Sequence, residues 1–198
     1  MWVRRRSSNR AERCRVSAAE WRRVPTGFGP ARRLRRVSSR FSHLDPLGRA
    51  RMVDITPKEP STRRAVARGR VVMKPETAGL IAGGGVSKGD VLAVARVAGI
   101  QASKHAATLI PLCHPVLVGA ALVNFTIEAD YVEVEAHVDA VDRTGVEMEA
   151  LVACSVACLT IYDMCKSIDR DMSIEQVALW EKSGGRSGSY RRASTPAD

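Results

Sequence analysis

Apolar and polar residues alternate in several segments of the chain, and this pattern predicts β-strands. The segment AVARGRVVM (65–73) alternates and is rich in β-branched residues. Segments 117–128 and 131–141 also alternate, and only the dipeptide AD separates them, which predicts a hairpin. In the second segment valine and alanine share one face, while two glutamates and His137 face solvent or a neighbouring subunit. Residues 172–182 predict a last strand.

Helical periodicity and breaker residues predict the remaining elements. Proline opens PETAGLIAGG, a short helix that ends in glycines. Residues 90–110 are helical in pattern, with a break expected near Gly99, and 146–167 form one long helix. Prolines bound IPLCHP, which predicts a fixed extended loop. The resulting βαββαβ order predicts an α+β, ferredoxin-like fold, with an antiparallel sheet and helices on one face.

The long helix contains a run, residues 150–161, in which almost every side chain is small or apolar. One small sheet covers only one side of such a helix, so we expect a second subunit to pack on the other side. The run is also only about a dozen residues, short of the roughly 20 that span a bilayer. The sequence therefore predicts an oligomer and no membrane helix.

The formal charge of +10 is concentrated at one end of the chain. Residues 1–40 hold 13 Lys or Arg and 2 Asp or Glu, whereas residues 41–198 hold 18 and 19. The first segment has no periodic apolar face, so it predicts a basic, disordered arm, or upstream sequence added by a wrongly chosen start. Residues 41–198 predict one catalytic domain with a glycine-rich tail, and their neutral balance argues against specific nucleic-acid binding.

The five cysteines favour a reduced, cytoplasmic protein. Their number is odd and no CxxC occurs, so neither a disulfide framework nor a zinc site is expected. Cys154, Cys158 and Cys165 lie at helical spacing in the apolar helix and are expected as small core residues. Cys113 lacks an identifiable general base, so a buried thiol is favoured over a nucleophile.

Polar residues in five places are candidates for chemistry. Asp163 and Lys166 stand three apart at the end of the long helix, as an ion pair or as an acid–base pair. GGGVSKGD places Lys88 after three glycines, as a plain turn or an anion-binding loop, and it does not match the phosphate loop of nucleotide triphosphatases. His114 lies between two prolines, which fix its position better than that of most loop histidines.

Two further candidates lie near the start of the long helix and in the tail. Glu147 and Glu149 suit the positive end of the helix dipole, or they contact a ligand. Lys182 and Arg186 flank a Gly-Gly turn, as a second anion grip or as a solvated tail. A helix places Glu149 and Asp163 roughly 21 Å apart along its axis. One molecule contacts both only if it is long or if the helices of two subunits run antiparallel.

Together these segments resemble a known family. MVDI, KGDVLAVARVAGIQASK, LIPLCHP, TGVEMEALVACSVACLTIYDMCK and KSGGRSG occur in the order and spacing typical of the molybdenum cofactor biosynthesis protein C family, the cyclic pyranopterin monophosphate synthases. The resemblance covers about residues 41–190. It implies a ferredoxin-like α+β fold and a hexamer of three dimers with active sites at subunit interfaces. It also implies conversion of 3′,8-cyclo-7,8-dihydro-GTP to cyclic pyranopterin monophosphate with release of pyrophosphate.

The resemblance also implies roles for individual residues. The catalytic positions of the family fall on Lys88, Asp163 and Lys166. Substrate-binding positions fall on Leu112, Cys113, His114, Glu147, Met148, Glu149, Lys182 and, as a weaker match shared with Asp54, Arg63. We expect proton transfer at Asp163 and Lys166 in a partly dry setting, a mixed acid and phosphate role for Lys88, and recognition of the base edge by Glu149.

The implied reaction rearranges bonds and moves protons without a redox change. Flavin, nicotinamide, iron–sulfur and metal motifs are therefore not expected, and the prediction is an enzyme of the lyase class without a cofactor. The alternative is a non-catalytic nucleotide-binding oligomer, because a fold alone does not imply catalysis. Such a sensor needs phosphate-binding residues but has no use for Asp163 beside Lys166.

Overall fold

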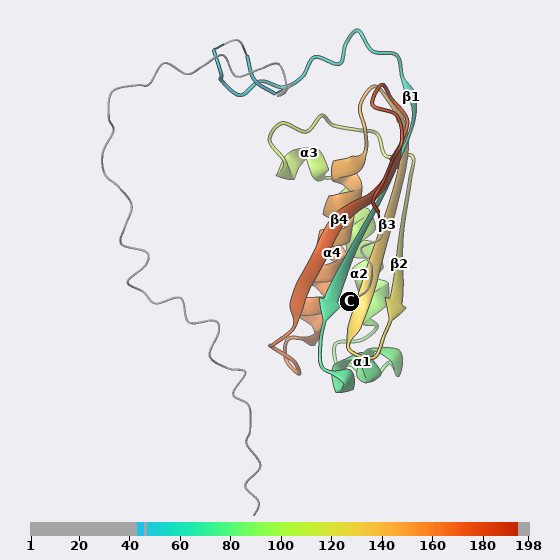
Figure 1. Ribbon diagram of the computed structural model, residues 1–198. Coiled ribbons are helices and arrows are strands. Elements are labelled where there is room, and N and C mark those ends of the chain that lie inside the picture. Colours follow the sequence, from blue (N-terminus) through green and yellow to red (C-terminus); the bar gives the residue numbers. More distant parts are fainter. Residues whose placement is uncertain (1–42, 46, 194–198) are drawn as a thin grey trace, which may run out of the picture. The chain divides into compact units, whose positions relative to one another are not determined.

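A computed structural model describes residues 43–45 and 47–193, which form an antiparallel sheet with helices on one face (Figure 1). In chain order the elements are β1 (Ser61–Val72), α1 (Pro75–Ala82), α2 (Val91–Ser103), α3 (Ala106–Leu109), β2 (Ala120–Ile127), β3 (Tyr131–Asp142), α4 (Glu147–Cys165), β4 (Ser173–Ser183) and β5 (Tyr190–Arg191). The strands lie in the order β2-β3-β1-β4-β5, and all pairs are antiparallel. The predicted ferredoxin-like α+β fold is confirmed.

The strands follow the predicted alternation, with differences at their ends. β2 and β3 form the expected hairpin, closed by a hydrogen bond from the Glu128 amide to the Tyr131 carbonyl at 2.8 Å. β1 begins four residues earlier than predicted, because Ser61 already pairs with Asp142 of β3. Arg63 and Arg64, two consecutive polar residues in this part of β1, interrupt the alternation of polar and apolar residues in the sequence. β5 lies in the segment that was predicted as a glycine-rich tail.

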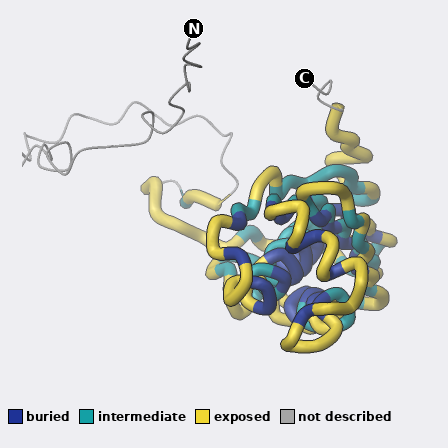
Figure 2. Tube along the Cα trace, turned by 90° about the horizontal axis from the view of Figure 1, so that it is seen from below, coloured by how far each residue is buried: buried dark blue, intermediate teal, exposed yellow. Residues whose placement is uncertain are grey.

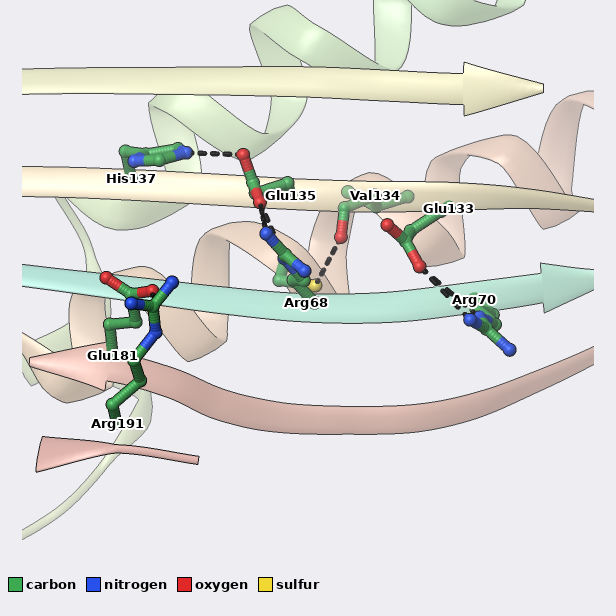
Figure 3. A network of polar contacts seen from close by, with 9 residues as sticks. Arg68, Arg70, Glu133, Val134, Glu135, His137, Glu181 and Arg191 are labelled. Atoms are coloured by element: carbon green, nitrogen blue, oxygen red, sulfur yellow. Dashed lines mark hydrogen bonds and ion pairs between the residues drawn. The ribbon is translucent and has the colours of Figure 1, made fainter. Parts of the chain in front are cut away.

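The two faces of β3 differ as predicted. Its valine and alanine side chains are buried against the helices, from Val132 to Ala140. On the opposite face Glu135 accepts hydrogen bonds from Arg68 and His137, and Glu133 pairs with Arg70 at 3.3 Å (Figure 3). Charges on this face therefore neutralise one another across neighbouring strands.

Helix α2 runs without interruption through Gly99, so the predicted break at this residue is wrong. A Cβ atom at Gly99 would lie 3.0 Å from the Ala153 carbonyl oxygen and 3.1 Å from Cγ2 of Val123. Glycine is therefore needed for the close approach of α2 to α4, and not for a bend. The interruption falls instead at Lys104 and His105, before the short α3.

Helix α4 packs on the sheet beside α2, and its buried positions form the centre of the core (Figure 2). The sheet and α2 of the same chain each cover one side of α4, and a second subunit on its remaining side stays a prediction. Leu159 remains 55% exposed. By length and composition alone α4 could cross a membrane, but core helices of soluble proteins meet the same criterion, and 56% of its apolar window is buried here.

Several predictions concern residues outside the part of the chain that the structure describes. The basic arm (1–40), Cys14 and the end of the tail (194–198) all lie there. Within the described residues Cys113, Cys154, Cys158 and Cys165 are free thiols, and the last three are buried as predicted.

Candidate active site

Helix α4 places the predicted site residues in two groups at its opposite ends. Glu147 and Glu149 lie in its first turn, and Asp163 lies in its last turn. A separation of 14 residues corresponds to about 21 Å along the axis. Figure 1 shows α3 near the first end and α1 near the second. A single chain therefore carries two separate groups of predicted site residues, one half-site at each end of α4.

The half-site at the C-terminal end of α4 is the Lys88–Asp163–Lys166 cluster. Lys166 Nζ lies 2.7 Å from one carboxylate oxygen of Asp163. Lys88 Nζ donates to the Asp163 backbone carbonyl at 2.8 Å and lies 3.6 Å from the other carboxylate oxygen. The structure thus brings together all three predicted catalytic residues, which come from α4 and from the loop between α1 and α2.

The electrostatics of this cluster favour the charged forms. Hydrogen bonding to Lys166, together with the charges of Lys166 and Lys88, lowers the pKa of Asp163. Asp163 in turn raises the pKa of Lys166. The side chains are 42–60% exposed, so the expected partly dry setting is not present within one chain. In this state Lys166 is a held proton donor and Asp163 a weak base.

The half-site at the N-terminal end of α4 contains a buried carboxylate, Glu149. Only 2% of this residue is exposed, and Cys113 Sγ donates to its Oε1 at 3.8 Å. Among the described residues its other oxygen, which is buried, has no hydrogen-bond partner. Burial raises the pKa of Glu149. A buried carboxylate with a free oxygen is costly for stability and suits a ligand that brings its own N–H donors.

Two other predicted site residues, Leu112 and His114, lie with Cys113 in the loop before β2. His114 Nε2 donates to the Val53 carbonyl at 2.8 Å, which fixes the ring and makes Nε2 the protonated nitrogen. Leu112 and Met148 are half-buried near the same end of α4. Asp54 accepts a hydrogen bond only from the Thr56 amide, at 2.9 Å, and so serves its own turn.

Cys113 is expected to react slowly with alkylating reagents. Burial, followed by the charge of Glu149, raises its pKa to about 11. At pH 8 its thiolate fraction is therefore about a hundredfold or more below that of an ordinary cysteine. Peptide mass spectrometry after iodoacetamide treatment should show labelling that increases up to about pH 11, and Glu149→Gln should accelerate it at pH 8. Labelling of Cys113 at the rate of a free thiol would contradict the buried contact.

Beside Glu147 lies a cavity of about 720 Å³ with a strongly basic lining. It is formed by the loop before β1, the loop before α4 and the turn after β4. Six basic residues line it: Lys58, Arg63, Arg64, Arg143, Lys182 and Arg186. Only two acidic residues oppose them, and one of these, Glu147, pairs with Lys182 at 3.1 Å. The balance of charge favours a polyanionic ligand.

Arg63 is the most informative of the cavity residues. It is 9% exposed, and its Nε donates to the Asp142 backbone carbonyl at 3.1 Å. No described carboxylate forms an ion pair with it. A buried guanidinium without a counter-charge is unfavourable unless a ligand supplies one, and its planar set of donors matches a phosphate.

The sequence did not point to Lys58, Arg64 or Arg143 as cavity residues. Arg143 Nε donates to the Lys58 carbonyl at 2.9 Å, so it joins two of the three loops. Arg64 of β1 forms an ion pair with Asp139 of the neighbouring strand β3 at 2.7 Å. The one available signal was the density of basic residues around the TG dipeptide and before β1, which by itself does not distinguish a cavity from a solvated surface.

The Gly-Gly turn after β4 allows this cavity to form. At Gly185 φ is +76°, and an added Cβ atom would lie 1.6 Å from Nη1 of Arg63. We therefore expect Gly185→Ala to displace the Arg63 guanidinium and raise KM for a phosphorylated substrate at least tenfold, as the loss of a charge-assisted hydrogen bond implies. Steady-state kinetics measures this.

Gly188→Ala is the matched control for that substitution. Gly188 also has a positive φ, +66°, but an added Cβ would meet nothing within 4 Å. Both variants carry the same kind of backbone strain, so they differ in the clash with Arg63. Equal KM values for the two variants would show that strain in the turn, and not the position of Arg63, sets substrate binding.

Comparisons with known proteins identify the chain as a whole. The MoaC family model matches residues 52–185. This chain belongs to the MoaC family. A protein of Chloroflexus aggregans named cyclic pyranopterin monophosphate synthase is 57% identical over 154 residues, which are 77% of this chain and 93% of the relative. One of the same name from Thermomicrobium roseum is 55% identical over 159 residues, which are 79% of this chain and 96% of the relative.

A third relative is more distant in origin but nearly as similar. Cyclic pyranopterin monophosphate synthase 1 of Mycobacterium tuberculosis is 54% identical over 156 residues, which are 78% of this chain and 92% of the relative. The matched family region contains Glu149, the Lys88–Asp163–Lys166 cluster and all the cavity-lining residues except Arg186 and Ser187. The predicted resemblance to the MoaC family is confirmed.

Proposed function

We propose that this protein converts 3′,8-cyclo-7,8-dihydro-GTP to cyclic pyranopterin monophosphate and releases pyrophosphate. Membership of the MoaC family and relatives named as synthases support an enzyme of molybdenum cofactor biosynthesis. The observation that carries the proposal is the basic cavity around Arg63, whose buried charge lacks a counter-charge among the described residues. It suits the triphosphate of such a substrate.

The test is to give purified protein the cyclised dihydro-GTP and to measure both products. Equimolar pyranopterin and pyrophosphate are expected. The alternative, a non-catalytic nucleotide sensor, predicts saturable binding of the substrate and its recovery unchanged. The names of the relatives do not favour that alternative.

Each half-site has its own task in this proposal. Arg63, Lys182 and Arg186 bind the phosphates, with Lys88 contributing further charge and His114 a further contact. Glu149 accepts hydrogen bonds from the ring N–H and amino groups of the guanine-derived base, which would pair its free oxygen. Two donors at a buried carboxylate favour its ionised form and so offset the effect of burial on its pKa.

Asp163 and Lys166 transfer the protons. Opening the purine ring and closing the pyran ring require protons to move among nitrogen, carbonyl and hydroxyl groups. Lys166, protonated beside Asp163, serves as the acid, and Asp163 becomes a stronger base when substrate displaces the water around it. Lys88 stabilises negative charge that develops on oxygen. All of these steps rearrange bonds without oxidation or reduction.

We also propose that a complete site combines two subunits. The two half-sites lie about 21 Å apart on one α4, and antiparallel α4 helices of two subunits would bring unlike ends together. A homohexamer built as three dimers, located in the cytoplasm, is the assembly that the family resemblance implies. Contact with a second subunit would also dry the Lys88–Asp163–Lys166 cluster.

The domain boundary gives a further prediction. We propose that residues 41–198 are the catalytic domain and that the basic segment 1–40 is dispensable. The β-sheet, its helices and both half-sites lie within residues 43–193. A chain that starts at Phe41 should therefore match the full chain in Tm, oligomer size and turnover. A fall of many degrees in Tm, or loss of activity, would show that the segment packs on the domain.

A further inference from the structure

The carboxylate of Asp169 is buried, yet none of the roles above uses it. It lies in the turn after α4, three residues beyond Lys166, and only 1% of the residue is exposed. Its Oδ2 accepts hydrogen bonds from the Lys74 amide at 2.8 Å and the Thr77 hydroxyl at 3.2 Å. Its Oδ1 accepts from the Asp171 amide at 3.2 Å. Both oxygens are therefore occupied by donors.

These donors connect two segments that are distant in the sequence. Lys74 is the N-cap residue of α1 and its side chain makes no capping hydrogen bond; Asp169 accepts from the Lys74 backbone N–H, one of the amides that a helix start leaves without an intrahelical partner. The Asp169 amide also donates to the Cys165 carbonyl at 3.0 Å, which ties the turn to the last residue of α4. One carboxylate thus fastens the start of α1 to the end of α4.

Both fastened segments lead to the catalytic cluster. On one side, the last turn of α4 carries Asp163, and Lys166 follows directly after the last residue of the helix. In the other direction α1 and a glycine turn lead to Lys88, which bonds back to the Asp163 carbonyl at 2.8 Å. The segment 74–88 is therefore fixed to α4 at both ends, once by Asp169 and once by Lys88.

We propose that Asp169 is a positioning residue that sets the distance between Lys88 and the Asp163–Lys166 pair. The proposal rests on the catalytic roles proposed above for this cluster. Hydrogen bonding from the Lys74 amide lowers the pKa of Asp169, which keeps it an acceptor at both oxygens over the working pH range. Loosening this contact shifts Lys88 relative to Asp163 and leaves the basic cavity, at the other end of α4, unchanged.

Asp169→Asn is the sharpest variant. Because both oxygens accept from N–H or O–H donors, the amide NH₂ must face a donor in either orientation. A misplacement of about 1 Å can cost about a hundredfold in rate, so we expect kcat to fall at least tenfold, with a smaller rise in KM because Lys88 is only one of several cations proposed for the phosphates. Asp171→Asn is the matched control: the carboxylates of Asp169 and Asp171 each lie 3.6 Å from Lys74 Nζ, but the Asp171 side chain is 87% exposed.

A second measurement does not depend on turnover. Competitive acetylation followed by mass spectrometry reports how well Lys88 and Lys166 are held, because a paired ammonium reacts more slowly than a free one. Asp169→Asn should increase acetylation of both lysines, and Asp171→Asn should not. Should Asp169→Asn fail to fold, Thr77→Val removes one donor from the same carboxylate and should show both effects in weaker form.

The results separate this proposal from the one on which it rests. Wild-type kcat and wild-type acetylation in a folded Asp169→Asn, or in Thr77→Val if the first does not fold, overturn the positioning role. If Lys88→Ala and Asp163→Ala retain turnover, the catalytic roles of the cluster are wrong, and the acetylation pattern still decides for Asp169. A rise in KM without a fall in kcat would also overturn it, since the phosphate-binding end would then be affected.

Discussion

Replacing Lys88, Asp163 or Lys166 with alanine is expected to abolish measurable turnover while the protein stays folded and oligomeric. All three are surface-exposed in one chain, so their loss leaves the core intact. Loss of one acid–base group alone typically costs about 10²–10⁴ in rate. Because each member also holds its neighbour in place, the losses should not be additive.

Matched controls are available for these variants. Lys104→Ala removes an exposed lysine at the end of α2, and Asp171→Asn removes an exposed carboxylate near α4. Turnover, Tm and light scattering are measured for all five proteins. A near wild-type rate in any cluster variant removes its assigned role. Monomeric variants would instead show that the ion pairs serve assembly.

The second large effect is expected from mixing two inactive proteins. Lys88→Ala disables one half-site, and Arg63→Ala with Glu149→Ala disables the other. If each site combines half-sites of two subunits, about a quarter of the sites in randomly mixed oligomers are intact in both halves. Co-expression of the two variants from one cell should therefore restore a substantial part of the wild-type activity.

The same experiment measures the geometry of the site. Variants that both carry their substitutions in one half-site, such as Lys88→Ala with Lys166→Ala, should remain inactive when co-expressed. Absence of recovery in the first mixture, with mixed oligomers demonstrated by mass spectrometry, would place the complete site within one chain. The roughly 21 Å between Glu149 and Asp163 would then need another explanation.

Most of the fold could be predicted from the sequence, because the alternation in the strands and the apolar run of α4 each have one dominant explanation. Gly99 was misread because a glycine in a helix has two meanings, a break or a close contact, and only the position of Ala153 distinguishes them. The cover of α4 could be predicted only in part, because the sequence does not tell which side of a helix its own neighbour α2 occupies.

The candidate site could be predicted only where short motifs carry it. Lys88, Asp163 and Lys166 lie in such motifs, and the structure brings them together. The basic cavity depends on three loops that meet in space, so the local density of basic residues could not identify Lys58 and Arg143 as cavity residues. The role of Asp169 could not be read either, since its partners, Lys74 and Thr77, stand more than 90 positions away.

The free oxygen of Glu149 has a consequence for the stability of the empty enzyme. A buried carboxylate oxygen without a partner lowers the free energy of unfolding, so the unliganded protein is less stable than the packing of its core would allow. A substrate that donates a hydrogen bond to this oxygen adds its binding free energy to the free energy of unfolding. The melting temperature therefore rises with the occupancy of the site. An apolar residue at this position would give a more stable protein that no longer recognises its substrate. Binding sites commonly lower stability in exchange for function in this way.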